Sequence, residues 1–575
     1  MQCEGAVLGP TSKPNMIIAA VLALLCTSAI MIHFYDQFWW PADEGVYAYV
    51  AQRANAGDII HRDIIDLHSG YGNALNALAF RMFGEDLLSL RYPLVVIAFV
   101  QSCIAFVLLK DKGAVTAFVG AVALAAFSFV QFPNPSANWH ALGVFFCLCL
   151  CLEKLPKGAP GRLLLAGFLV GVCFFTRQLS GVFLCLGLAC VLLAEAEKSW
   201  SNARVSSVLI GGIATLGLLL YVASKQSLFG IFWAGLWPMS IMVVASLRAR
   251  VSVGEAIKTL GAVLAGFILA GLPLAILAFS HDALMFWIND IFVTALLINS
   301  QDFIDEQSYL FVVFGAVKAV LAPSGGVAFV SGLAWLALIL SVPLLGAYAS
   351  LKYFRDRALP PSVILAVFWV VGGLHYQIPI YFYFVLPAAL LGGLMLRSTP
   401  AILVGLIALS CWALVFQAAQ PLSRSYQGLI EGERAAANVP ANLPRVSLRV
   451  QAEDAALYRD LIETIEATAR PSEPLMTVPM EPQINFMTAR ESPVRYYATP
   501  LGLRVDQDVL DTLKSLDAEA PLFVVHRRGD KYLTPLSATL LDEIKVRSEQ
   551  PMSFGTLDLY RYHGSHDPST SVVVR

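Results

Sequence analysis

Long apolar segments separated by short polar turns occupy the first 420 residues of the chain. A helix needs about 20 apolar residues to cross the hydrocarbon core of a bilayer. Thirteen windows approach this length, and we predict a helix in each. These windows are 16–34, 91–109, 114–132, 139–152, 162–176, 179–194, 205–223, 228–246, 260–279, 327–349, 360–374, 376–396 and 400–419.

Composition agrees with this pattern, because 57% of the 575 residues are hydrophobic and only 14% are charged. Ordinary soluble chains carry far more charge and fewer apolar residues. We therefore predict a polytopic α-helical membrane protein. The net charge of −2 gives no sign of nucleic-acid binding.

Basic residues are distributed unequally between the turns, which predicts an orientation. Lys and Arg are more frequent in cytoplasmic loops. With the N-terminus in the cytoplasm, the inner turns receive most of the basic residues, including Lys110, Lys154 and Arg248. The same orientation places two acidic loops, 35–90 and 280–318, outside, where we expect helices along the membrane surface.

The composition changes at about residue 421, so we divide the chain into a membrane domain, 1–420, and an extracytoplasmic domain, 421–575. The second domain has the mixed pattern of a small α/β fold. We predict an irregular tail from about 564. The expected helices are 453–469, 506–516 and 536–547, and the expected strands are 474–479 and 521–526.

Several kinds of site are absent from the sequence. It contains no Gly-rich nucleotide loop and no GxSxG elbow, so an ATP-driven pump and a serine hydrolase are disfavoured. The ten cysteines lie in apolar segments or at the extreme N-terminus, where they fit small core side chains. We expect no cofactor, and His61 and His68 do not have a spacing that indicates a divalent metal.

Asp43 and Glu44 follow Trp39, Trp40 and Pro41 at the predicted start of a helix. Acids at a helix start commonly serve as caps. Adjacent helical residues point about 100° apart, so only one of the pair can face a given pocket. The other can cap the helix or bind a neighbouring base, and both remain candidate catalytic residues at this point.

Arg177 lies between two apolar segments, in CFFTRQLSGVF. An arginine in this position needs an acid, a carbonyl or a phosphate as partner, or else reaches the interface as an anchor. The predicted orientation puts it on the same side as Asp43, and a guanidinium suits phosphate oxygens. We therefore favour a phosphate-binding role.

Other polar residues in the predicted outer turns are candidates for substrate binding. Exposed charge and ordinary hydrogen bonding are the alternatives for each of them. They are Arg62, Asp63, Asp66, His68, Asn138, His140 and His375.

The run from Asp43 to Leu94 resembles the first extracytoplasmic loop of GT-C type membrane glycosyltransferases. It is most similar to bacterial relatives of protein O-mannosyltransferases and of the lipid A aminoarabinose transferase. The matching features are the DE pair, Arg62-Asp63 to Asp66, Phe83-Gly84 and Arg91. Further similar segments are TRQLSG (176–181), HYQIPIYFYFVLP (375–387) and VPMEPQINFMTARESPVRYY (478–497).

The resemblance implies transfer of a sugar, with inversion, from a polyprenyl-phosphate donor to an acceptor at the outer face of the bacterial inner membrane. It assigns Asp43 as the base or acceptor-orienting group and Arg177 as the contact to the lipid phosphate. Two positions depart from the family. Asn138 and His140 stand where many relatives have an Asp, and Gly372 and Gly373 stand where an arginine and an aspartate often precede the late histidine.

Three functions were weighed on this basis. The first is the glycosyltransferase, whose partners would be a polyprenyl-phosphate sugar, membrane lipids and a glycan, lipid or protein acceptor. A secondary transporter or lipid flippase is the alternative, although no internal repeat is evident and the charges cluster at one edge. A non-catalytic scaffold would be favoured by a pocket that lacks Asp43 and Arg177.

Overall fold

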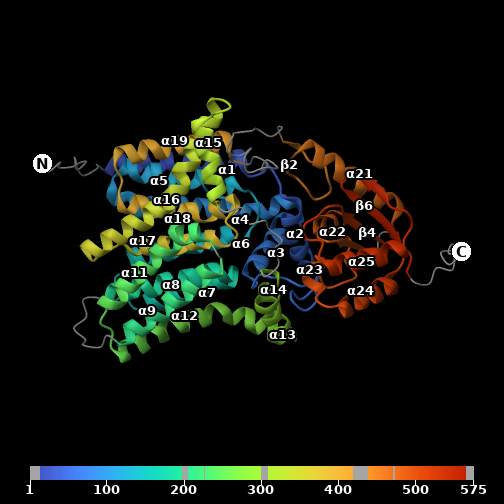
Figure 1. The fold of residues 1–575 in the computed structure, drawn as a ribbon, viewed down its shortest axis with the longest axis horizontal. Coiled ribbons are helices and arrows are strands. Elements are labelled where there is room, and N and C mark those ends of the chain that lie inside the picture. Colours follow the sequence, from blue (N-terminus) through green and yellow to red (C-terminus); the bar gives the residue numbers. More distant parts are fainter. Residues whose placement is uncertain are drawn as a thin grey trace.

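The computed structural model describes residues 13–196, 205–225, 227–299, 309–418, 438–470 and 473–564. A bundle of long helices forms one end of the molecule, and a smaller C-terminal region, residues 438–564, forms the other (Figure 1). Two helices from the first polar loop, α2 (Pro41–Ala56) and α3 (Tyr71–Phe83), lie between these two parts. The predicted tail lies outside the described residues, apart from Gly564.

All thirteen predicted windows coincide with helices. Among the described residues, nine helical segments are long and apolar enough to cross a membrane. These nine are Pro14–Phe34, Leu87–Lys112, Ala114–Gln131, Gln178–Glu195, Val205–Ser224, Leu228–Arg248, Val253–Ser280, Gly326–Asp356 and Pro379–Leu396. The other four windows are α6 (Ala137–Lys154), α7 (Arg162–Thr176), α17 with η7 (Pro361–Leu374) and α19 (Pro400–Phe416). They are shorter or more polar at their ends.

Local sequence explains where many of these helices begin. Proline occupies an early position in α2, α4 (Tyr92–Leu109), α17, α18 (Pro379–Leu396) and α19, where its missing N–H costs nothing. In α12 (Val253–Ser280) the Ser252 side chain accepts from the Glu255 N–H while Glu255 accepts from Ser252, which is a capping box.

Small residues set the closest helix contact in the bundle, between α7 and α12. A Cβ at Gly167 or Gly266 would overlap the backbone of the opposite helix. Close backbone approach at glycine is the usual way in which helices associate where lipid removes the hydrophobic drive.

The second polar loop is also largely helical. It contains α13 (Leu284–Ile288), the π-helix η6 (Asn289–Thr294) and α14 (Ala295–Asn299), followed after a gap in the described residues by α15 (Tyr309–Leu321). α15 packs against α16 (Gly326–Asp356). That the loop helices lie along a membrane surface remains a prediction.

The C-terminal region has a four-stranded sheet in the order β3-β4-β6-β5. β3 (Leu475–Val478) and β4 (Leu522–Arg527) are parallel, whereas β6 (Leu557–Tyr562) pairs antiparallel with β4 and with β5 (Met552–Phe554). Its helices are α21 (Ala452–Thr468), α22 (Pro482–Thr488), α23 (Thr499–Gly502), α24 (Asp506–Glu519) and α25 (Pro535–Val546). A short hairpin, β1 (Val439–Pro440) with β2 (Arg449–Val450), precedes them.

The five elements predicted for this region are present, with ends within three residues of the predicted ones. The sequence did not predict helices α22 and α23 or strands β1, β2, β5 and β6.

One hydrophobic core joins α2 and α3 to the C-terminal region. The Phe80 ring stacks on the Phe486 ring with centroids 5.6 Å apart. Gly45 on α2 lies against the backbone of Gln483, where a side chain would not fit. The start of α2 is therefore fixed between the bundle and the C-terminal region.

Candidate active site

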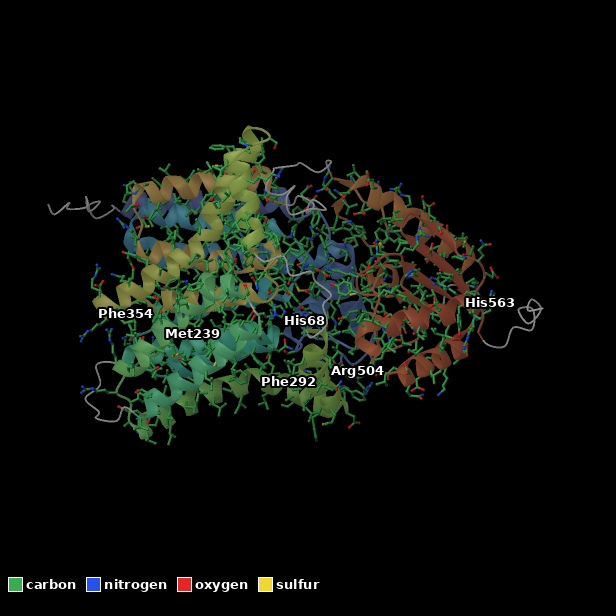
Figure 2. All side chains as sticks on the ribbon, viewed as in Figure 1. His68, Met239, Phe292, Phe354, Arg504 and His563 are labelled. Atoms are coloured by element: carbon green, nitrogen blue, oxygen red, sulfur yellow. The ribbon has the colours of Figure 1, made fainter. Side chains whose placement is uncertain are left out.

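A cavity of about 580 Å³ lies where the bundle, α2 and the C-terminal region meet. Both Asp43 and Arg177 line it, together with His68 and Asn138. Figure 2 shows His68 at this boundary. The structure thus brings together four of the predicted candidates, which come from four separate segments of the sequence.

Asp43 reaches the cavity because of how α2 begins. Trp40 is extended at the N-cap and Pro41 starts the helix, so Asp43 falls in the first turn. Burial raises the pKa of Asp43 to about 6, and the positive charges of Lys531 and His68 oppose this shift. A carboxyl group with a pKa near neutrality is suited to accepting a proton.

Arg177 occupies the break between α7 and α8 (Gln178–Glu195), where its backbone is extended, with φ −150° and ψ 111°. Its guanidinium lies over the Tyr381 ring, 5.3 Å from the centroid. Within the described part of the chain, no carboxylate is within salt-bridge distance of it. The cation is therefore available to an anionic ligand in the cavity.

Glu44 does not line the cavity, and its predicted catalytic role stays a prediction. The side chains of Glu44 and Arg91 are both fully buried, and Arg91 Nη2 lies 2.8 Å from Glu44 Oε1. The same oxygen accepts from the Trp40 N–H at 2.9 Å. Burial raises the pKa of Glu44, although Arg91 opposes that shift. Glu44 caps α2 and binds a base, which is the alternative that the sequence had left open.

Asp66 lies behind the cavity and does not line it. Its buried carboxylate accepts hydrogen bonds from the His68 backbone N–H at 3.1 Å and from the Asn73 amide at 2.5 Å. The carboxylate also lies 3.1 Å from His68 Nδ1. Burial raises the pKa of Asp66, but the charges of His68 and His61 and the hydrogen bonds from His68 and Asn73 together outweigh this, so the pKa is lowered overall. Asp66 therefore orients His68, which does face the cavity.

Arg62 and Asp63 do not line the cavity, and the prediction that they bind substrate stays a prediction. Arg62 Nε donates to Asp63 at 2.9 Å, and Arg62 Nη1 donates to the His281 carbonyl at 3.0 Å. This partly exposed pair connects the two polar loops.

His140 and His375 do not line the cavity. His140 is buried, and His375 is half-buried. The His375 ring packs on Tyr376 and Tyr381, and its carbonyl accepts from Lys225 Nζ at 2.9 Å. Asn138, in contrast, lines the cavity and donates to Ser136 Oγ at 2.8 Å.

The C-terminal region supplies cavity residues that were not predicted. Lys531 and Tyr532 come from the loop after β4, and Tyr497 and Met480 come from the segment around α22. No local signal marks Lys531, because GDKY reads as an ordinary polar turn. Tyr381 was not predicted as a single residue either. It lies in the aromatic segment 375–387, which resembles the family as a whole.

The expectation that no metal or cofactor takes part stays a prediction. In the described ranges, no group of three His, Cys, Asp or Glu residues could hold a metal ion.

Comparison by sequence finds no matching family model and no matching curated protein. Comparison of structures does find similar folds. The crystal structure of ArnT from Cupriavidus metallidurans bound to undecaprenyl phosphate has a TM-score of 0.51 and 13% identity, over 96% of this chain and 98% of that chain. The chain therefore has a fold similar to that of this ArnT.

The apo structure of ArnT from the same organism has a TM-score of 0.49 and 13% identity, over 95% of this chain and 97% of that chain. At the level of the fold, the match with a TM-score of 0.51 confirms the resemblance seen in the sequence.

Proposed function

We propose that the protein is an inverting glycosyltransferase that moves a sugar from a polyprenyl-phosphate donor to an acceptor. The observation that carries this proposal is that Asp43 and Arg177 line one cavity. Burial raises the pKa of the Asp43 carboxyl group. Arg177 has no carboxylate partner among the described residues. A scaffold would not require this pair. The cavity therefore supports an enzyme over the scaffold considered from the sequence.

In the proposed reaction, Asp43 takes the proton of an acceptor hydroxyl as its oxygen attacks the anomeric carbon. The bond from that carbon to the phosphate oxygen breaks, and its electron pair leaves with the polyprenyl phosphate. A single displacement of this kind inverts the anomeric carbon. Arg177 stabilises the negative charge that grows on the phosphate.

The cavity walls fit a lipid-linked donor. Apolar and aromatic side chains, among them Phe132, Ile378 and Phe384, line the bundle side next to Arg177. The ArnT with the similar fold was crystallised with undecaprenyl phosphate. A donor of this class carries its own activated sugar, so the reaction needs no nucleotide site.

We also propose that the protein lies in the bacterial inner membrane, with its N-terminus in the cytoplasm. In this orientation the cavity and residues 421–575 lie on the outer face. Support comes from the excess of basic residues on the turns assigned to the cytoplasm.

The test is a lipid and glycan analysis of a strain from which the gene has been deleted. Mass spectrometry should show one polyprenyl-phosphate sugar accumulating and one envelope decoration missing. Wild-type protein should reverse both changes, whereas Asp43→Asn at equal abundance should not. Asp63→Asn, which changes an acid outside the cavity, is the matched control and should behave as wild type. Full reversal by Asp43→Asn would refute the proposal.

A further inference from the structure

A second cavity of about 580 Å³ adjoins the first, between α14 and the C-terminal region. The two cavities share three lining residues, Ile298, Pro500 and Lys531. Lys531 therefore stands where the cavities meet, and it is also the largest opposite charge acting on Asp43. Any molecule that fills both cavities must pass this lysine.

The walls of the second cavity combine apolar surface with positive charge. Leu297, Leu503 and Leu536 contribute apolar surface, and Lys531 and Arg504 contribute cations. None of the described residues that line it is a carboxylate. A pocket of this kind suits a ligand with an apolar portion and an anionic group.

Arg504 is held at the edge of this cavity, because its guanidinium donates to the Thr294 hydroxyl of η6 at 2.5 Å. Figure 2 labels Arg504 of the C-terminal region. Lys531, in contrast, has no carboxylate within salt-bridge distance in the described ranges, and its ammonium lies 5.4 Å from the Tyr532 ring centroid. Of the two cations, Lys531 is thus the one left for a ligand.

The neighbouring helix offers a route from the membrane. Phe292, Leu296 and Leu297 are 47%, 70% and 42% exposed, which is typical of a surface that contacts lipid. Leu297 both belongs to this surface and lines the second cavity. An amphiphile could therefore enter the cavity sideways, with its polar end directed toward Lys531.

We propose that the second cavity binds the acceptor, and that the acceptor is an amphiphile whose anionic group is held by Lys531 at the junction of the two cavities. This inference rests on the proposed function, because it assigns the first cavity to the donor. Lys531 would position the acceptor so that a hydroxyl near its anionic group reaches Asp43. The C-terminal region then completes the reaction site and selects the acceptor.

The test counts anionic amphiphiles bound to the full-length protein in neutral detergent by native mass spectrometry, with dodecyl phosphate as the probe. Wild-type protein should bind two molecules. Lys531→Met should lose one of them, Lys531→Arg should keep both, and Arg177→Met should lose the other. Lys514→Met, which changes an exposed lysine of the same region, should keep both.

A second variant tests the cavity by shape rather than by charge. Leu297→Trp should fill the second cavity and remove the same molecule as Lys531→Met, whereas Phe292→Trp, on the neighbouring lipid-facing surface, should not. In a transfer assay, Lys531→Met should raise the KM for the acceptor by roughly tenfold or more, as expected for loss of a charge-assisted hydrogen bond, with the KM for the donor unchanged.

Three results would overturn the inference: two molecules still bound to Lys531→Met, equal binding of neutral dodecanol in the second cavity, or displacement by inorganic phosphate at the same concentration. Failure of the donor assignment is a different result. In that case Arg177→Met would keep both molecules while Lys531→Met still lost one.

Discussion

Two neighbouring acids at the start of α2 lie in opposite surroundings. Glu44 is enclosed with Arg91, and the guanidinium also donates to the carbonyls of Gln37 at 2.8 Å and Phe38 at 2.5 Å. Asp43, one residue earlier, faces a cavity that holds Arg177 and Lys531 at its walls. The carboxylate of Glu44 is occupied by structural hydrogen bonds, whereas the carboxylate of Asp43 remains available for chemistry.

The difference shows that burial alone does not identify a functional acid. A buried charge is tolerated when its hydrogen bonds are satisfied, and Glu44 meets that condition. Burial raises the pKa of Asp43, and the positive charges of Lys531 and His68 only partly oppose this shift. The environment of Asp43 therefore suits a group that gains and loses a proton. Four experiments test this difference between Asp43 and Glu44.

The largest effect is expected for Asp43→Asn. Loss of a positioned general base lowers rates by roughly 10²- to 10⁴-fold. We expect kcat to fall by this factor while the thermal unfolding midpoint in detergent stays at or above that of the wild type, because the amide carries no charge to bury. A transfer assay with purified protein, donor and acceptor would measure kcat, and thermal unfolding of the same protein in detergent would measure the midpoint. A variant that is inactive only because it unfolds early would contradict the assignment.

Glu44→Gln should act on stability instead. Removing one partner of a buried ion pair costs about 3–5 kcal/mol, since Arg91 would keep an uncompensated charge. Unfolding in mixed micelles would measure the loss, and the double variant Glu44→Gln with Arg91→Met should lose less than the sum of the single variants. A low rate per folded molecule at wild-type stability would instead place Glu44 in the chemistry.

Arg177→Met should reduce transfer without changing the fold. Deleting one group that stabilises transition-state charge typically costs roughly 10²- to 10³-fold in rate. We expect kcat/KM for the donor to fall by this factor, with partial recovery in Arg177→Lys, which keeps the charge but not the planar fork. Unchanged donor kinetics would remove Arg177 from the phosphate site.

The smallest effect is expected in the pH dependence of transfer. The base must be ionised, and the pKa of Asp43 is raised to about 6, so kcat/KM should fall as the pH drops through about 6 and level off above it. Lys531 lowers this pKa, so Lys531→Met should raise it and move the acidic limb to higher pH. A flat profile across about pH 5 to 8 would contradict the role of Asp43 as base.

Sequence alone located the helices of the bundle and, in the C-terminal region, the three longest helices and strands β3 and β4. Hydropathy over about 20 residues and turn signals such as Pro41 and Pro400 are local properties, so the sequence displays them directly. The same holds for the pairing of an acid at 43 with an arginine at 177 on one side of the bundle. That expectation needed only the order of the apolar segments.

Tertiary structure decided which candidates share the cavity. Glu44 pairs with Arg91 and Arg62 pairs with Asp63. Neither His140 nor His375 lines the cavity. Lys531 arrived from a turn almost 490 residues after Asp43 in the sequence. The direction of a side chain and contacts at such separations depend on how whole elements pack, and no short pattern in the chain records them.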